Sequence, residues 1–392
     1  MRHSLQNIIK KSVDNALRCI FNAAYIRCRS INEGWFSEGR GMKLKSICSR
    51  FGAARWAPLC GMPILIVLLF ATSTFAANRY VSLAGGHVSP FTNWAGASTT
   101  IQAAVDVSGA GDAIWVTNGT YYENVTNTIG ATIRSANNDP NNTIINGGDV
   151  GRCVMMGTST SSWLVGFTVM NGSLYNWSEE ESSWGGGVYG GMVSNCIITA
   201  NHVAWVAGGV CRNTIYNSLI VGNSSSEEGG GIVQCAAYNC SIIANYAPMA
   251  GGSDNSVLYS CLIASNSASY GGGGSSWDNL YCCTVAGNYG GGVYQSYLFN
   301  SISWGNSASD YQPNDCFSCG EGYAGVGSIT NNPLFVGGGN YRLQAGSPCI
   351  NAGTNQAWMT GAKDLAGHNR ITGGTVDMGA YERPRKFNTY LY

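Results

Sequence analysis

Asn195-Cys196-Ile197-Ile198-Thr199-Ala200-Asn201 is the stretch that decides the fold, because variants of it recur along the middle of the chain. The related segments are Asn217 to Asn223, Asn239 to Asn245, Ser260 to Asn266, Cys282 to Asn288 and Asn300 to Asn306. Their closing asparagines are separated by 22, 22, 21, 22 and 18 residues, and a glycine run lies between most copies. Such a period indicates a solenoid in which each repeat forms one coil.

The composition of each repeat indicates strands and turns. Its apolar stretches are short, rich in Ile, Val and Tyr, and bounded by Gly, Asn and Ser. We therefore predict a parallel β-solenoid whose equivalent residues stack about 4.8 Å apart. The closing asparagines should form an amide ladder at one bend. The position three residues before each asparagine should point inward; it holds Ile198, Ile220, Ile242, Ile263, Val285 and, as an exception, Ser303.

Cysteines occupy a second repeat position, at Cys196, Cys240, Cys261 and Cys283. We expect them to be inward thiols, because parallel Cβ vectors on neighbouring coils do not suit the dihedral angle of a disulfide. For Cys316 and Cys319 we favour a local disulfide or loop staple over a metal site.

The segment before the repeats predicts a cap for the solenoid. Residues 98–107 are typical of a short amphipathic helix with a Ser/Thr N-cap, followed by a strand at residues 113–116. A helix at this place would cover the open end of the first coil.

Three further motifs stand in the C-terminal part of the chain: Asn332-Pro333-Leu334-Phe335-Val336, Ser347-Pro348-Cys349-Ile350-Asn351-Ala352-Gly353 and Val376-Asp377-Met378-Gly379-Ala380-Tyr381-Glu382. With these motifs, the chain from Arg79 onward resembles bacterial secreted right-handed parallel β-helix proteins of the pectate-lyase-like fold. This series is similar to the terminal module named choice-of-anchor Q. The resemblance implies an all-β right-handed parallel β-helix with coils of about 22 residues over 77–341, including a short N-terminal capping helix. It also implies a C-terminal capping or anchor-like module over 342–382 and a tail over 383–392.

The first 76 residues indicate export. They carry eleven Lys/Arg and three Asp/Glu, and a basic segment precedes the apolar run at 62–71. That run is too short to span a bilayer, and small residues follow it, as in a signal peptide. We predict a signal peptide over 42–76, a mature chain that begins near Ala77, and a gene-model extension or disordered leader over 1–41. We expect a secreted or cell-surface monomer with no transmembrane span in the mature chain.

Charge limits the choice of partner. Residues 77–392 carry ten basic and eighteen acidic residues, so this part of the chain is unsuited to neutralising the phosphates of a nucleic acid. An extracellular polysaccharide or surface matrix fits the predicted location better.

The acidic residues suggest two kinds of chemistry. Glu179–Glu181 and Glu227–Glu228 precede glycine runs two coils apart. A pair such as Glu180 and Glu228 could hydrolyse a glycosidic bond, and Arg212 could serve a lyase as its base. Glu181 and Glu227 could instead bind Ca²⁺ through carboxylate oxygens. Solvated loop charges are the alternative.

Aromatic residues precede the glycine runs at Trp184, Tyr270 and Tyr289, with Trp205 nearby. We expect these four to stand along one edge and bind sugar rings, or else to cover the coil's own backbone. Carbohydrate or matrix binding is therefore the predicted function. A polysaccharide lyase or glycoside hydrolase is the first alternative, and a structural spacer of a surface layer is the second.

Overall fold

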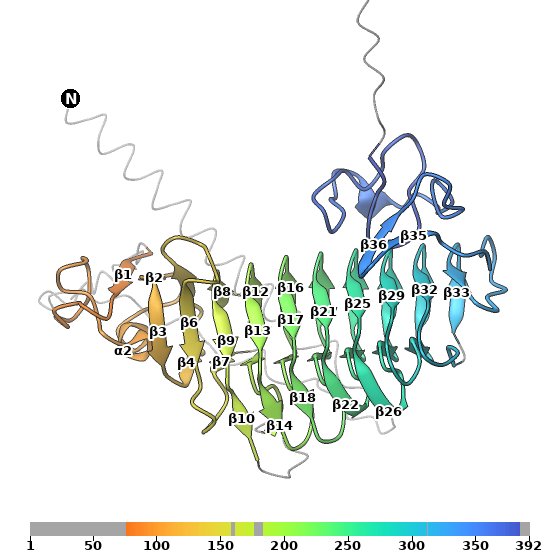
Figure 1. Cartoon of the computed structure of the whole chain (residues 1–392). Coiled ribbons are helices and arrows are strands. Elements are labelled where there is room, and N and C mark those ends of the chain that lie inside the picture. The colour runs from red at the N-terminus through yellow and green to blue at the C-terminus, as the bar shows by residue number, and fades with distance from the viewer. Residues whose placement is uncertain (1–75, 158–160, 176–182, 312, 385–392) are drawn as a thin grey trace, which may run out of the picture. The chain divides into compact units, whose positions relative to one another are not determined.

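The computed structural model describes residues 76–157, 161–175, 183–311 and 313–384. These residues form a right-handed parallel β-helix, seen as stacked coils in Figure 1. The predicted leader over 1–41, residues 42–75 of the predicted signal peptide and residues 385–392 lie outside the described residues. Within the described residues, no helix is long and apolar enough to cross a membrane.

Each full coil passes in turn through four parallel sheets, which we name sheets A, B, D and C in that order along the chain. Sheet A contains β1 (Asn78–Val81), β2 (Ala113–Val116), β5 (Thr132–Ser135), β8 (Trp163–Val165), β12 (Met192–Ser194), β16 (Thr214–Tyr216), β20 (Ala236–Tyr238), β24 (Val257–Tyr259), β28 (Asn279–Tyr281), β31 (Tyr297–Phe299) and β33 (Asn314–Cys316). Sheet B contains β3 (Gly119–Tyr122), β6 (Thr143–Asn146), β9 (Thr168–Met170), β13 (Ile197–Thr199), β17 (Leu219–Val221), β21 (Ser241–Ile243), β25 (Leu262–Ala264), β29 (Thr284–Ala286), β32 (Ile302–Trp304) and β34 (Cys319–Gly320).

The other two sheets complete the coil. Sheet C contains β4 (Val125–Asn127), β7 (Val154–Met156), β11 (Val188–Tyr189), β15 (Val210–Cys211), β19 (Ile232–Val233), β23 (Ser253–Asp254), β27 (Ser275–Ser276) and β30 (Val293–Tyr294). Sheet D contains β10 (Ser173–Leu174), β14 (His202–Val203), β18 (Ser224–Ser225), β22 (Tyr246–Met249) and β26 (Ser267–Gly271). Outside the coils, β35 (Phe335–Gly337) and β36 (Asn340–Leu343) form an antiparallel pair.

The predicted inward row and amide ladder are both confirmed. Ile198 pairs with Ile220, and Ile220 with Ile242, and all three side chains are fully buried. The ladder asparagines follow sheet B, and each amide bonds to the next. Asn223 Nδ2, for example, donates to Asn245 Oδ1 over 3.0 Å. The ladder thus satisfies polar groups that the coil would otherwise bury without partners.

One of the two cysteine predictions is confirmed and the other is wrong. The row at Cys196, Cys240, Cys261 and Cys283 is buried as unbridged thiols, as predicted. The Cys316–Cys319 disulfide is wrong: both cysteines are free thiols, and the Cys319 thiol donates to Asn331 O over 3.2 Å in a buried cluster that also holds Cys349. Cys319 turns inward at the start of β34, whereas Cys316 ends a strand of sheet A.

The capping helix is present but shorter than 98–107. Helix α2 (Ile101–Asp106) begins after Thr100, whose Oγ1 accepts from the Ala103 amide over 3.4 Å. Glu123 adds a second cap, because its carboxylate accepts from the Ile101 and Gln102 amides over 2.7 and 2.9 Å. Its negative charge there also suits the positive end of the helix dipole.

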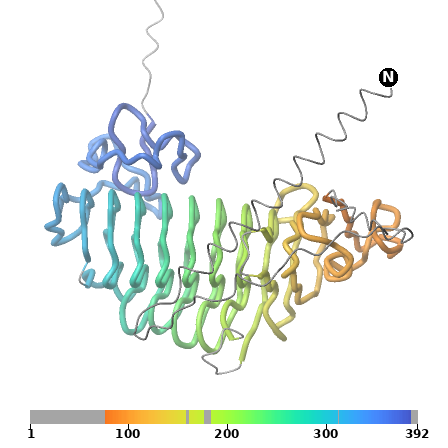
Figure 2. Tube along the Cα trace, turned by 180° about the vertical axis from the view of Figure 1, so that it is seen from behind, coloured from red at the N-terminus to blue at the C-terminus, as the bar shows by residue number. Residues whose placement is uncertain are grey.

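The C-terminal part packs on the flank of the coils (Figures 1 and 2), although its resemblance implied a closing cap. The last parallel strand, β34, ends at Gly320, before the expected boundary at 341. We name residues 344–384 the C-terminal module. The Gly379 amide donates to Asn300 O over 2.7 Å, and the Ala380 amide donates to Thr284 Oγ1 over 2.9 Å. The last coil is instead covered by the loop after β34, in which Tyr323 is buried in the main core.

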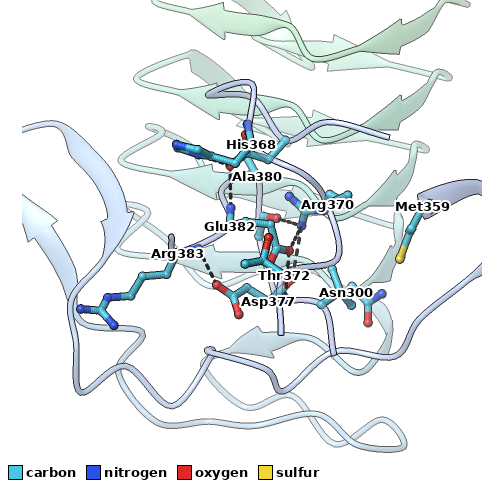
Figure 3. Close-up of polar contacts among 12 residues, drawn as sticks. Asn300, Met359, His368, Arg370, Thr372, Asp377, Ala380, Glu382 and Arg383 are labelled. Carbon is cyan, nitrogen blue, oxygen red and sulfur yellow. Dashed lines mark hydrogen bonds and ion pairs between the residues drawn. The ribbon is translucent and has the colours of Figure 1, made fainter. Parts of the chain in front are cut away.

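A buried charge cluster organises the C-terminal module (Figure 3). Arg370 is fully buried and lies 3.6 Å from Glu382 Oε1, which also accepts from the Asp377 amide over 3.0 Å. Arg370 donates to the carbonyl oxygens of Gly379 and Asp377. A buried cation must be paired in this way, so the cluster fixes the fold of a segment with little regular secondary structure.

Candidate functional site

A groove runs over the outer face of sheet C. Its volume is about 560 Å³, and we name it the sheet C groove. It is lined by Trp184, Trp205, Val206, Glu228, Val233, Gln234, Asp254, Asn255 and Trp277. A set of apolar and aromatic side chains with a few polar groups is typical of a ligand site.

The floor and one wall of the groove come from stacked repeat positions. Val233 pairs with Asp254 in register, so these two side chains follow each other along the floor. The residue after each of the sheet C strands β11, β15, β19, β23, β27 and β30 has a positive φ and turns the chain towards sheet A. This position supplies Gln234, Asn255 and Trp277, with φ values of 53°, 46° and 55°. Because this left-handed turn recurs in successive coils, it places one outward side chain after another along the wall.

Trp184, Trp205 and Glu228 form the opposite wall, and Arg212 fastens it. The Arg212 guanidinium lies 5.1 Å from the centre of the Trp184 ring, and its Nε donates to Gln234 Oε1 over 2.8 Å. Arg212 therefore links the two walls but does not line the groove. Arg212, which the sequence suggested as a lyase base, therefore holds Trp184 and Gln234 in place.

Two carboxylates face the groove, and burial raises the pKa of both. Asp254 is only 5% exposed, and its Oδ1 has no hydrogen-bond partner among the described residues. Desolvation, with further contributions from Asp278 and Glu228, raises its pKa to about 8. Desolvation, followed by repulsion from Glu227, also raises the pKa of Glu228. Asp254 is therefore mostly protonated at neutral pH.

Asp278 lies under the same wall, inside the coil. Its carboxylate accepts from the Ser256 amide and the Ser275 hydroxyl, each over 2.7 Å. Burial nevertheless raises its pKa to about 7. Asp254 and Asp278 thus share a poorly solvated region, in which two ionised carboxylates would repel each other.

The predicted aromatic row is only partly assembled. Trp184 and Trp205 line the groove, whereas Tyr270 and Tyr289 do not, although they are 82% and 67% exposed. The expectation that all four stand along one edge is wrong. Tyr289 pairs with Ser267 and so continues the row of Tyr246 in sheet D, and Tyr270 lies near the end of β26.

The predicted acidic sites are less complete. Glu180 and Glu181 lie outside the described residues. Glu227 is exposed and does not line the groove. No three His, Cys, Asp or Glu side chains among the residues described come together in a way that could hold a metal ion. The Ca²⁺ site therefore stays a prediction.

Sequence reasoning missed Asp254 and Trp277. A signal for Trp277 was present, because Arg212, Gln234, Asn255 and Trp277 follow each other at intervals of 22, 21 and 22 residues. Aligning that position would have placed Trp277 on the same wall as Gln234.

Comparisons with known proteins support the fold. No protein-family model and no curated protein sequence matches the chain. Among solved structures, pectate lyase Pel9A is similar with a TM-score of 0.50 and 13% identity, covering 79% of this chain and 98% of that one. A rhamnogalacturonan lyase has a TM-score of 0.39 and 10% identity, over 76% of this chain and 96% of that one. A pectin methylesterase from Aspergillus niger has a TM-score of 0.33 and 16% identity, over 62% of this chain and 87% of that one. The similarity to pectate lyase Pel9A, at 13% identity, supports the right-handed parallel β-helix fold alone and leaves the function to the site.

Proposed function

We propose that the chain is a secreted parallel β-helix protein that binds an extracellular polysaccharide in the sheet C groove. The observation that carries this proposal is the presence of three indoles, Trp184, Trp205 and Trp277, in one groove. The flat ring of an indole packs against the apolar C–H face of a sugar ring. Gln234 and Asn255 add amide groups that can bond to sugar hydroxyls.

Trp277 provides the most direct test, because it is 55% exposed and tolerates a mild substitution. Asn255 occupies the same left-handed position one coil earlier, so Trp277→Asn keeps a residue that this turn accepts. We expect this variant to lose retention in affinity electrophoresis on the polysaccharide that the wild type binds. Trp94→Ala is a matched control, because Trp94 is 45% exposed and lies outside the groove.

The same assay tests the exposed tyrosines predicted from sequence. If Tyr270→Ala and Tyr289→Ala weaken retention while Trp277→Asn does not, the glycan binds at the edge of sheet D and the groove proposal is wrong. If no variant changes retention because the wild type binds no polysaccharide, the role as a structural spacer is favoured.

Hydrolysis of the bound glycan is a second candidate function, favoured by the raised pKa of Asp254. Glycoside hydrolysis needs one protonated carboxyl group to donate to the leaving oxygen and one carboxylate to act as base or nucleophile. Asp254, with a pKa of about 8, could fill the first role and Glu228 the second. The lyase alternative has less support, because Arg212 contacts Trp184 and Gln234 and does not line the groove.

Enzymatic turnover has a distinct signature. If Asp254 is the acid, release of reducing ends should fall as pH rises through about 8, and Asp254→Asn should lower the rate by about 10²–10⁴-fold. Glu228→Gln should abolish turnover but leave retention nearly unchanged. Unsaturated products would instead indicate a lyase, and release that continues well above pH 8 would exclude Asp254 as the acid.

A further inference from the structure

We infer that the protein has a second saccharide site, in a cleft between the outer face of sheet A and the C-terminal module. The cleft has a volume of about 780 Å³, within the range of small-molecule sites. It is lined by Asn217, Tyr238, Asn239, Tyr259, Ser260, Trp358 and the loop 362–367. This inference extends the proposed glycan binding to a separate place on the molecule, and none of these residues lines the sheet C groove.

The floor of the cleft is part of a tyrosine ladder. Tyr216, Tyr238, Tyr259 and Tyr281 occupy one repeat position of sheet A. Their successive ring centroids are 5.1, 5.0 and 4.9 Å apart, and the planes are within 13° of parallel. Because the rings cover each other's faces, each half-buried residue presents its edge and its hydroxyl group. The result is a row of hydroxyl groups at a spacing close to the length of one sugar ring in an extended glycan.

The wall opposite this floor comes from the C-terminal module. Trp358 lies in the 3-10 helix η2 (Ala357–Met359) and meets Tyr259 edge to face, with ring centroids 5.0 Å apart. The Asp364 carboxylate holds the loop 362–367, since it accepts from the Ala366 and His368 amides over 2.9 and 2.7 Å. The module thus supplies an ordered aromatic wall over a polar row.

The polar groups of the cleft indicate a neutral, hydroxyl-rich ligand. Ser260 is 1% exposed, and its hydroxyl has no hydrogen-bond partner among the described residues. Asn217 and Asn239 add side-chain amides at the equivalent turn position. The Asp364 carboxylate is buried and caps its own loop. Lys363 is exposed, and its Nζ donates to the neutral Asn369 Oδ1 over 2.6 Å, so it keeps a positive charge at the rim of the cleft. The other lining side chains are uncharged, which favours a hydroxyl-rich ligand over a strongly charged one.

A peptide is a poorer fit for the same cleft. The strands of its floor, β20 and β24, are hydrogen-bonded to sheet neighbours on both sides, so they offer no edge for an added strand. Aromatic edges, amides and hydroxyls suit a sugar, whose ring carries both hydroxyl groups and apolar C–H surfaces.

The experiment is isothermal titration of the full chain with neutral hexasaccharides of glucose, xylose, mannose and galactose. The double variant Tyr238→Phe/Tyr259→Phe removes two hydroxyls and keeps the rings, as Phe299 does at this position of the ladder. We expect at least one hexasaccharide to bind to the wild type. The double variant and Trp358→Ala should each lower the affinity for that hexasaccharide at least tenfold. Tyr281→Phe is the matched control, because Tyr281 belongs to the ladder but does not line the cleft.

Further variants separate this inference from the groove proposal. Trp277→Asn should leave hexasaccharide binding unchanged. If Trp277→Asn abolishes it and the cleft variants do not, the cleft inference is wrong and the groove stands. If only the cleft variants affect glycan binding of any kind, the groove proposal fails and the cleft stands. Absence of binding to all four neutral hexasaccharides, or binding of a peptide of residues 385–392 in the cleft, overturns the inference.

Discussion

Replacing Asn245 with alanine tests the ladder that holds successive coils together. The Asn245 Oδ1 accepts from the Asn223 amide over 2.9 Å and from Asn223 Nδ2 over 3.0 Å. Its own Nδ2 donates to Ile220 O over 3.0 Å and to Asn266 Oδ1 over 3.0 Å. Alanine therefore leaves the backbone N–H of Asn223 and one of its two Nδ2 hydrogens without an acceptor at a place that water does not reach, while Nδ2 keeps its bond to Ile198 O.

The size of the effect follows from those two donors. An unsatisfied buried donor costs about 1–3 kcal/mol, so Asn245→Ala should lower the free energy of unfolding by about 2–6 kcal/mol. Asn306 provides the matched control. Its Oδ1 accepts the same two bonds from Asn288, but Asn306 is only half-buried, so water can replace them. Asn306→Ala should cost clearly less.

Urea unfolding followed by circular dichroism measures both variants, with the slope against urea checked for a change in cooperativity. The reasoning is refuted if Asn245→Ala lies within about 1 kcal/mol of the wild type. It is also refuted if Asn306→Ala costs as much as Asn245→Ala.

Three other predictions concern packing, charge and export. Ile242→Ala should lower the free energy of unfolding in urea by about 2–5 kcal/mol, because it leaves a cavity at a fully buried site. Ile243→Ala, on the outer face, should lower it much less. Equal losses would show that the inward register is wrong. The pKa of Asp254 is raised in the folded state to about 8, so the native state binds more protons than the unfolded state between about pH 4 and pH 8, and stability should fall as pH rises through that window. Asp254→Ser should therefore lose less stability than the wild type between pH 5 and pH 9, and identical losses would argue against the raised pKa. Secreted protein should begin near Ala77 by N-terminal sequencing, and recovery of an intact Met1 outside the cell would exclude the proposed processing.

The regular part of the fold could be predicted because the aligned repeats show which positions recur in every coil. In five of the six segments the residue three positions before the ladder asparagine is apolar, so the amide ladder and the row through Ile242 follow from one alignment. The C-terminal module could not be placed in the same way. Its position on the flank depends on contacts such as that of Gly379 with Asn300, which have no periodic signal.

The candidate site could be predicted only in part, for a physical reason. Loops between the ladder and the glycine runs differ in length, and the register shifts between Ala247 and Met249, so counting back from glycine placed Tyr289 in the wrong row. Asp254 was missed because its repeat position otherwise holds uncharged residues, such as Val233 one coil earlier. Its raised pKa arises first from burial and then from Asp278 and Glu228 on other coils, an environment that only the folded structure creates.

Oxidative footprinting of the tryptophans with hydroxyl radicals tests the central claim most directly. Trp277 and Trp94 are 55% and 45% exposed, so both should be oxidised in the free protein. With a saturating amount of the polysaccharide that the protein retains, glycan in the sheet C groove predicts strong protection of Trp277 and unchanged oxidation of Trp94. Equal oxidation of Trp277 with and without the bound polysaccharide would contradict the claim.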